Sequence, residues 1–192
     1  LQTADWILVQ LERECGLAVG SIDLLPIIET GLGVHNIEEI TMAKTRVKRV
    51  SFGAGDYTRD MNLVWTGLEQ ELAYTRGRIV LASRAAEIEP PIDSVFIDLK
   101  DNEHLKLSTQ KALEFGFQGK LCIHPDQVSL VNDVFTPDPS EVTRAEKIIS
   151  AFEKAEASGS ASIQVDGYFV DYPIVEKARR ILKISENIRA AI

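Results

Sequence analysis

Residues 50–56 read VSFGAGD, a short apolar stretch that runs into two glycines and stops on a carboxylate. Three other stretches, 24–29, 94–99 and 120–125, are also continuously apolar and end beside polar residues. Continuous apolar strands that alternate with helical patterns are typical of a parallel sheet covered by helices. The sequence therefore predicts an α/β fold with four such strands. Their carboxyl ends, which carry the polar residues, form the edge where α/β proteins place their sites.

The residues after 136 follow a different pattern. Asp138, Pro139 and Glu141 have the order of an N-cap, a first helical residue and a capping-box partner, so a helix is expected to begin there. Residues 162–170 read as a hairpin with Asp-Gly at its turn, and Pro173 opens a last helix. The sequence predicts a catalytic part at 1–136 and a separate lid or oligomerisation subdomain at 137–192.

Composition limits the class of protein. Of the 192 residues, 45% are hydrophobic and 26% charged, and the net charge is −8 with the basic residues scattered. No nucleic-acid groove, attraction to an anionic membrane or membrane span is expected. Cys15 and Cys122 are too few for a disulfide framework, and both are expected to be small buried hydrophobes in a reducing compartment. A cytoplasmic or organelle-matrix enzyme is the default interpretation.

Glu29 and Asp56 are the first candidates for chemistry. Each ends an apolar strand, and the ends of neighbouring parallel strands lie about 5 Å apart, so both carboxylates could reach one ion. Two carboxylates with waters and substrate oxygens suit Mg²⁺, with Mn²⁺ as an alternative. Gly53 and Gly55 would leave room for a ligand to approach the backbone. An equally acceptable interpretation is that the two carboxylates only cap the helices that follow.

Other interpretations of the strand ends are weaker. The stretch GAGD lacks the third glycine of a dinucleotide loop and the lysine and hydroxyl of a P-loop, and no helix is expected directly after it. His124, which precedes Pro125, could be a ligand, a base or a residue that positions substrate. Asp166 lies in an Asp-Gly turn, where aspartate is common for purely conformational reasons.

Five stretches, taken together, point to one family. They are LLPIIETGLGVHNIEEI (24–40), RVKRVSFGAGDYTRDM (46–61), ELAYTRGRIVLASRAAEIEPPIDSVFIDLKD (71–101), GFQGKLCIHPDQV (116–128) and VDGYFVD (165–171). In this order and spacing they resemble the citrate lyase β-subunit-like (HpcH/HpaI aldolase) family along almost the whole chain. Members of that family are TIM (β/α)8 barrels, which need about 250 residues. The resemblance thus implies that 1–136 is the second half of a barrel, about four βα units, and that 137–192 is its C-terminal lid.

The resemblance also implies an activity. Family members are Mg²⁺-dependent carbon–carbon lyases that cleave or form 3-hydroxyacyl thioesters of the citramalyl-CoA, malyl-CoA or citryl type, giving a 2-keto acid and an acetyl thioester. The motifs IET and FGxxD carry the family's metal ligands, which correspond to Glu29 and Asp56. Asp166 matches a catalytic aspartate of the lid, which acts on a neighbouring subunit's site. His124 and Pro125, with Gly53 and Gly55, are expected to border the substrate, and the helix with Tyr74, Arg76 and Arg78 is expected to line the same cleft.

Several alternatives remain open at the level of sequence. The family's substrate-binding arginine lies on an earlier strand that these residues do not include. A malyl-CoA thioesterase and a metal-dependent aldolase acting on free hydroxy-keto acids are the enzymatic alternatives. A non-catalytic subunit that binds metal or CoA is the alternative of another class. The resemblance implies an acyl-CoA or acyl-carrier thioester as substrate and a homo-oligomer, trimer or hexamer, as the assembly.

Overall fold

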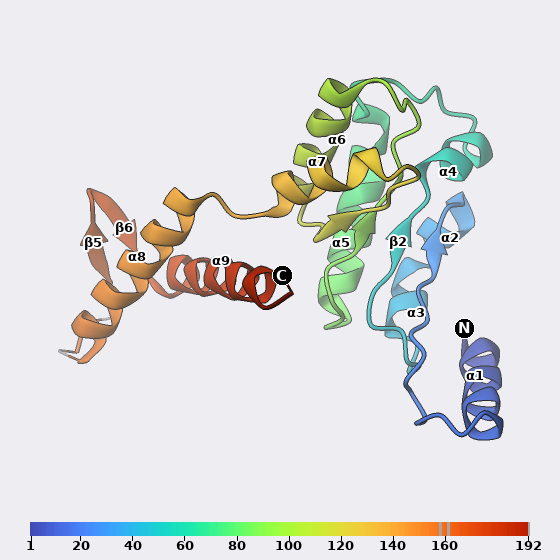
Figure 1. Ribbon diagram of the computed structural model, residues 1–192, viewed down its shortest axis with the longest axis horizontal. Helices are drawn as coiled ribbons and strands as arrows, with labels where there is room; N and C mark the ends of the chain where they lie inside the picture. The colour runs from blue at the N-terminus through green and yellow to red at the C-terminus, as the bar shows by residue number, and fades with distance from the viewer. Residues whose placement is uncertain (158, 161, 192) are drawn as a thin grey trace. The chain divides into compact units, whose positions relative to one another are not determined.

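The computed structural model of the chain describes residues 1–157, 159–160 and 162–191. These residues divide into two compact units, 1–135 and 136–192 (Figure 1). The elements, in chain order, are α1 (Gln2–Glu14), β1 (Ile27–Ile28), α2 (Gly31–His35), α3 (Ile37–Met42), β2 (Ser51–Phe52), α4 (Ala54–Asp60), η1 (Gln70–Leu72), α5 (Ala73–Ala85), β3 (Ile92–Asp93), α6 (Asn102–Phe115), β4 (Gly119–Lys120), α7 (Asp126–Phe135), α8 (Pro139–Ala157), β5 (Ile163–Val165), β6 (Tyr168–Val170) and α9 (Tyr172–Ala191).

The first unit is built on a parallel sheet whose strand order is β1-β2-β3-β4. Each strand pairs with the next along the chain, and a helical segment connects each pair. The predicted α/β fold with a parallel sheet is therefore confirmed. All four strands point the same way, so the segments that follow Ile28, Phe52, Asp93 and Lys120 meet at one edge.

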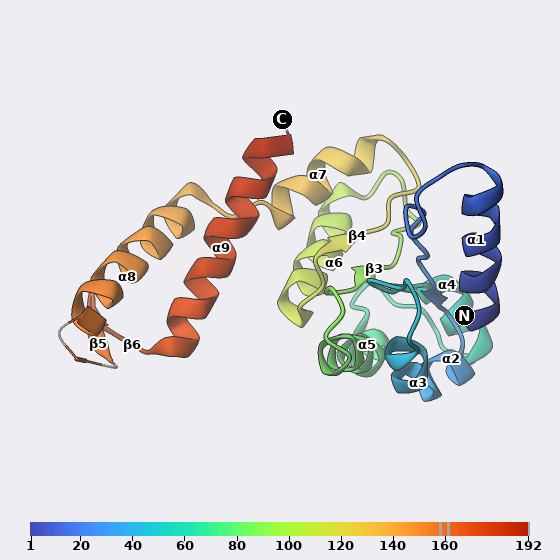
Figure 2. The same ribbon diagram turned by 90° about the horizontal axis from the view of Figure 1, so that it is seen from below.

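One face of this sheet holds the hydrophobic core. Ile28 and Phe52, which are partners in the sheet, are buried together with apolar residues of α2, α3, α5 and α6. Figure 2 shows α5, α3 and α2 in a row on one side of the strands. Side chains alternate along a strand, so Ile27 points to the opposite face, where it is 52% exposed. Helices thus cover one face of the sheet, and the edge strand β1 leaves apolar surface on the other.

The strands are shorter than predicted, and the third is misplaced. We expected a strand at 94–99, but β3 is Ile92–Asp93, directly after two prolines, and residues 94–98 form an irregular connection. The prediction failed because 94–99 is more apolar than 92–93. The charge of Asp93 in β3 is balanced by residues distant in the sequence. The second strand also ends early, since helix α4 begins at Ala54, inside the motif GAGD. Our expectation that no helix follows these glycines was therefore wrong.

A cluster of four charges is buried on the helix-covered side. Both Asp93 oxygens bind Arg76, at 2.9 and 3.0 Å, and Oδ2 also accepts a hydrogen bond from Lys120 Nζ at 2.7 Å. Arg76 also donates to Glu69 at 3.0 Å, and Glu69 accepts the Ser108 hydroxyl. All four charged side chains are at most 3% exposed. Two positive and two negative charges balance, so the cluster joins β3, β4 and α5 without an uncompensated buried charge.

The pKa of Asp93 reflects this balance. Burial disfavours the carboxylate and would raise its pKa, but the charges of Lys120 and Arg76 act in the opposite direction and prevail. The pKa therefore lies below the usual aspartate value. A lowered pKa means that the charged form stabilises the fold above the ordinary aspartate range, and that this contribution is lost in more acidic solution.

A second, smaller cluster of three charges attaches α1 to the rest of the first unit. Arg46 Nη1 and Nη2 contact the Glu12 carboxylate at 2.6 and 3.0 Å, and Nε contacts Asp5 at 2.5 Å. The Glu12 carboxylate also accepts the backbone N–H groups of Gly20 and Ile22 at 2.9 Å. The bonds from Arg46, together with those from the two amides, lower the pKa of Glu12 to about 2 against the opposing effect of burial. The loop after α1 is thus folded around one carboxylate.

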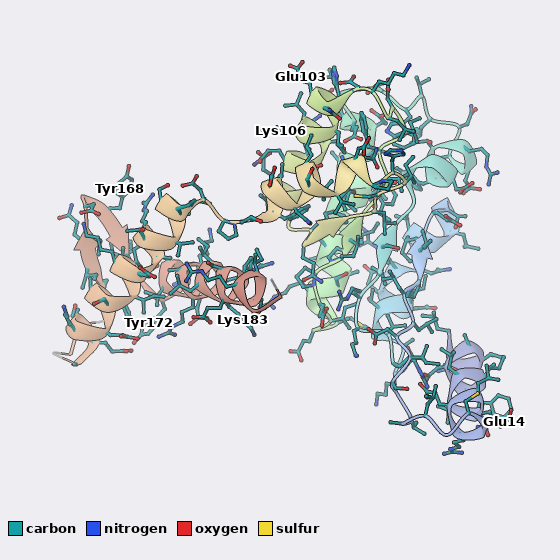
Figure 3. All side chains as sticks on the ribbon, viewed as in Figure 1. Glu14, Glu103, Lys106, Tyr168, Tyr172 and Lys183 are labelled. Atoms are coloured by element: carbon teal, nitrogen blue, oxygen red, sulfur yellow. The ribbon has the colours of Figure 1, made fainter. Side chains whose placement is uncertain are left out.

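The second unit consists of two helices and a hairpin. As predicted, α8 begins with a capping box, since Asp138 Oδ1 accepts the N–H of Ser140 and Glu141 accepts the N–H of Asp138. The predicted hairpin is also present, as β5 and β6 pair antiparallel around the Asp-Gly turn. Helices α8 and α9 and the hairpin share a small apolar core. Tyr168 and Tyr172, labelled in Figure 3, are both at least half exposed.

The two cysteines do not lie where we expected them. Cys15 caps the end of α1 and Cys122 follows β4, and both are exposed rather than buried. Cys122 had been assigned to the interior of a strand, but β4 ends at Lys120, so its side chain belongs to a connection at the sheet edge. Across the described residues, no helix has the length and hydropathy that crossing a membrane requires.

Removal of the negative charge of Asp93 tests the importance of the buried cluster. Asp93→Asn leaves Arg76 and Lys120 with only Glu69 to balance them, and we expect a loss of about 3–5 kcal/mol in the free energy of unfolding. Urea unfolding followed by tryptophan fluorescence measures this change, because Trp6 and Trp65 both lie in the first unit. Asp23→Asn is the matched control, since Asp23 pairs with Lys48 on the surface and its loss should have little effect. Equal, small effects of the two variants would contradict the assigned role.

Candidate metal centre

Glu29 and Gly53 lie side by side at the edge of the sheet. Ile28 is paired with Phe52, so the next residues of the two strands are level, and the N–H of Gly53 donates to the carbonyl of Ile28 at 2.9 Å. A Cβ atom on Gly53 would lie 2.7 Å from Glu29 Cβ and 2.8 Å from Glu29 Oε2. The Glu29 side chain therefore lies across the backbone at the end of β2. Only glycine leaves it that space.

Asp56 is brought to the same edge by helix α4. It lies in the first turn of this helix, three residues after Gly53. Its side chain is 52% exposed and forms an ion pair with Arg59 at 2.9 Å. Such an exposed pair contributes little free energy, so a bound cation could replace the guanidinium at small cost. Asp56 is thus accessible to a ligand from solvent.

Neither carboxylate caps the helix that follows it. The N-cap of α2 is Thr30, whose hydroxyl accepts the N–H of Gly33 at 3.0 Å. The N-cap of α4 is Gly53, which has no side chain to make a capping hydrogen bond, and Asp56 lies inside this helix. The capping interpretation of Glu29 and Asp56, left open by the sequence, therefore has no support in the structure.

Ser94, a residue that our sequence interpretation missed, holds the start of α4. Its hydroxyl accepts the N–H of Ala54 at 2.8 Å, and the side chain is buried. Ser94 comes directly after β3, so the third strand fixes the turn that leads to Asp56. The sequence predicts Ser94 as the first residue of the strand 94–99, where a serine gives no signal of such a role.

The ligands available at this edge suit a hard cation. Within the described part of the chain, no group of three or more His, Cys, Asp or Glu residues could hold a metal. The two carboxylates would supply oxygen ligands, Glu29 from the end of β1 and Asp56 from the first turn of α4. Mg²⁺ accepts such an incomplete set, because it retains waters and takes further oxygens from substrate. The residues present therefore fit Mg²⁺.

His124 and Pro125 lie at the same sheet edge, in the turn between β4 and α7. His124 Nδ1 accepts the N–H of Asp126 at 3.2 Å, so this ring nitrogen is occupied by a local turn. The buried Gln127 fixes the position of the turn, since its amide binds the N–H of Ile123 at 3.0 Å and the carbonyl of Phe96 at 2.9 Å. Gln127 thus joins the connections after β3 and β4.

The arginines of helix α5 do not line this edge as expected. Arg76 is 1% exposed and belongs to the buried charge cluster. Arg78 pairs with Glu38 of α3 at 2.7 Å, which joins two covering helices. Tyr74 is 72% exposed. The expectation that this helix lines the cleft through Arg76 and Arg78 therefore finds no support, because the contacts of both arginines join elements of the first unit.

Asp166 occupies the hairpin turn of the second unit. Its φ of 50° and the 82° of Gly167 are both left-handed, as a two-residue turn of this kind requires. Asp166 Oδ1 accepts a hydrogen bond from Lys147 Nζ of α8 at 2.5 Å, and both side chains are 57% exposed. The carboxylate is therefore accessible but held by a lysine.

The chain shares its sequence pattern with known proteins. A family model described as HpcH/HpaI aldolase/citrate lyase matches residues 1–125. The citrate lyase subunit beta of Leuconostoc mesenteroides subsp. cremoris is 38% identical over 179 residues, which cover 93% of this chain and 59% of the relative. The L-malyl-CoA/beta-methylmalyl-CoA lyase of Rhodobacter capsulatus is 34% identical over 182 residues, covering 86% of this chain and 57% of the relative. The chain thus spans less than two thirds of each of these proteins.

A solved structure shares the fold. The protein CitE from Mycobacterium tuberculosis, in complex with magnesium and pyruvate, is 26% identical and superposes with a TM-score of 0.55. The match covers 66% of this chain and 56% of that chain. Magnesium is therefore a ligand of a structurally similar relative.

Gly53→Ala tests the close approach of Glu29 to β2. The new Cβ would force the Glu29 side chain away, and overpacking of this kind costs about 1–3 kcal/mol. We expect a lower free energy of unfolding and weaker binding of Mg²⁺, measured by urea unfolding and isothermal titration calorimetry. Gly55→Ala is the control, since its Cβ would meet only Trp65, at an ordinary 3.6 Å. If Gly55→Ala were as damaging as Gly53→Ala, the argument from Glu29 would fail.

Proposed function

We propose that this chain, which belongs to the HpcH/HpaI aldolase/citrate lyase family, supplies the metal-binding part of a Mg²⁺-dependent carbon–carbon lyase for acyl thioesters. The observation that carries the proposal is the position of Glu29 beside Gly53, with Asp56 in the helical turn that follows. The resemblance read from five stretches of sequence is confirmed by the family match. The substrate proposed is a 3-hydroxyacyl thioester of the citramalyl-CoA, malyl-CoA or citryl type.

The relatives support this substrate class. One is the β subunit of a citrate lyase and another is a lyase of L-malyl-CoA and β-methylmalyl-CoA. Both kinds of substrate are 2-hydroxy acids whose neighbouring carbon leads to an acyl group. The citrate lyase relative also favours a second form of the proposal, in which the thioester is carried by a partner protein of a multi-subunit complex.

In the proposed reaction, Glu29 and Asp56 hold the ion through carboxylate oxygens. When bound, Mg²⁺ polarises the hydroxyl oxygen of the 2-hydroxy acid and fixes its orientation. Gly53, Gly55, His124 and Pro125 are proposed to border the bound substrate. The clearance at Gly53 and the location of His124 at the same sheet edge are the supporting observations.

In the bond-breaking step, the hydroxyl proton passes to solvent water. The oxygen electron pair then forms a C=O bond while the carbon–carbon bond breaks. The electrons of that bond leave on the thioester fragment as an enolate, and the other product is a 2-keto acid. The enolate carbon then needs a proton, and Asp166 is the proposed donor. An exposed carboxylate at the tip of a hairpin is suited to reach a site in another subunit.

We also propose that residues 1–135 are half of a (β/α)8 barrel. Four parallel strands in sequential order and an exposed apolar residue, Ile27, on the uncovered face support this proposal. The chain spans 59% of the citrate lyase relative, which leaves room for further strands in an intact protein. A homo-oligomer, trimer or hexamer, belongs to the same proposal.

Loss of either carboxylate tests the metal centre. In the intact protein, Glu29→Gln and Asp56→Asn should each weaken Mn²⁺ binding by more than tenfold, because each removes a charged ligand. Electron paramagnetic resonance of free Mn²⁺ measures this affinity. Glu103→Gln, a change of an exposed glutamate in α6, should leave affinity unchanged. The same variants should lose Mg²⁺-dependent cleavage of malyl-, citramalyl- or citryl-thioesters. A wild-type protein that binds Mn²⁺ but cleaves none of the three would contradict the lyase proposal.

Asp166→Asn tests the proton donor. Without a carboxyl group to protonate the enolate, turnover should fall about 10²–10⁴-fold while Mn²⁺ affinity stays the same. Lys147→Met is the matched control, since it removes the ion pair but keeps the carboxylate, and it should retain most turnover. Near-normal turnover of Asp166→Asn would remove this residue from the mechanism.

A further inference from the structure

We propose that Asp60 is a positioning residue of the metal centre, holding the turn that carries Glu29 against the helix that carries Asp56. The inference rests on the proposed Mg²⁺ site and adds a residue to it. Asp60 Oδ2 accepts the N–H of Gly31 at 2.7 Å, across 29 residues of chain. Gly31 opens α2 and comes two residues after Glu29.

Asp60 and Asp56 belong to the same short helix. They are four residues apart in α4, so their side chains lie on one face of the helix, one turn apart. Both are exposed, but their partners differ, since Asp56 pairs with Arg59 of the same helix whereas Asp60 accepts a backbone N–H from another segment. The two carboxylates thus have different tasks. The bond of Asp60 joins the helix to the neighbouring strand end, and the local ion pair of Asp56 can be replaced by a ligand.

The end of α4 also packs closely against Gly31. A Cβ on Gly31 would lie 2.6 Å from Met61 Sδ and 3.5 Å from Asp60 Oδ2. Asp60 is the last residue of α4 and Met61 is its C-cap, so both ends of this contact with Gly31 come from the end of one helix. The N–H···O⁻ bond is charge-assisted, which makes it stronger than a bond between neutral groups.

This bond acts where the sheet no longer does. The pairing of β1 and β2 ends at Ile28 and Phe52, and the last ladder hydrogen bond is donated by Gly53. Both carboxylates lie beyond that point. Glu29 is in the segment that leads into α2, and Asp56 is in the first turn of α4. The Asp60–Gly31 hydrogen bond joins these two segments beyond the end of the sheet. Its loss should change the separation of the two carboxylates while the sheet and its core remain intact.

The experiment uses the intact protein and measures two quantities. Mn²⁺ affinity is followed by electron paramagnetic resonance, and the exchange rate of the Gly31 amide by NMR or mass spectrometry. We expect Asp60→Ala to weaken Mn²⁺ binding about tenfold, the low end of effects seen when a supporting partner of a metal ligand is lost. The Gly31 amide should exchange faster in the same variant. Asp60→Asn keeps an acceptor oxygen and should remain within about threefold of wild type. Asp23→Ala, which removes a surface carboxylate bound to Lys48, should change neither quantity.

Gly31→Pro provides a second variant that leaves Asp60 intact. Proline is accepted at the first position of a helix, and Thr30 already has the extended conformation that a following proline requires. The substitution removes the N–H donor and displaces the flexible end of Met61, so Mn²⁺ affinity should fall as in Asp60→Ala. This variant also keeps the test decisive if Asp60→Ala fails to fold.

The outcomes separate this inference from the proposed function. Wild-type Mn²⁺ affinity in Asp60→Ala would overturn the positioning role. An equal loss in Asp60→Asn, with the Gly31 amide still protected, would also overturn it, because Asp60 would then act through its charge. A wild-type protein that binds no Mn²⁺ would refute the metal site itself. In that case, unchanged exchange of Gly31 in Asp60→Ala would separately refute the contact.

Discussion

The buried cluster of Arg76, Asp93, Lys120 and Glu69 is the interaction on which the first unit depends. It holds β3 to β4 and both strands to α5 at a depth where a single unpaired charge would be strongly destabilising. It also fixes the end of β3, because Asp93 is the last residue of that strand. The next residue is Ser94, whose hydroxyl accepts the first N–H of α4.

A path of contacts therefore leads from the core to the candidate site. The ion cluster fixes Asp93, Ser94 fixes the start of α4, and α4 presents Asp56 at one end and Asp60 at the other. The strands β1 to β4 are very short, two residues each, so their hydrogen bonds alone cannot define the positions of side chains beyond the strand ends. Side-chain bonds to backbone amides do this instead. Preorganisation of the site is thus a property of Ser94, Asp60 and Gly53 as much as of the sheet.

The fold class was readable from the sequence because continuous apolar stretches and helical periods are local patterns. The N-terminus of α8 and the hairpin of the second unit were predictable for the same reason, since a capping box and an Asp-Gly turn each act within a few residues. The position of β3 could not be predicted from the sequence. Its aspartate looks like a strand breaker until Arg76 and Lys120, 17 and 27 residues away, neutralise it.

The candidate site was likewise predictable only where local patterns indicate it. The sequence shows that Glu29 and Asp56 follow apolar stretches, although Asp56 lies in the first turn of α4 and not at the end of a strand. Glycine at 53 indicates a close approach but does not identify the approaching group. The structure adds that the approaching group is the Glu29 side chain. Ser94, Asp60 and Gln127 escaped notice because each acts on a backbone amide or carbonyl distant in the sequence. The two arginines of α5 misled for a related reason. A basic residue near a predicted cleft looks like an anion ligand until its carboxylate partner is known.

The ion pair between Asp56 and Arg59 gives the site a further property. In the absence of a cation, the guanidinium compensates a carboxylate that would otherwise repel its neighbours Glu29 and Asp60. The pair is exposed and made within one turn of helix, so breaking it requires little free energy and no change of backbone. At the proposed metal site, a divalent ion would bring twice the charge of the guanidinium to Asp56, with Glu29 as its second carboxylate. Exchange of Arg59 for Mg²⁺ would then cost only an exposed ion pair, and the displaced arginine would remain in the same turn of α4.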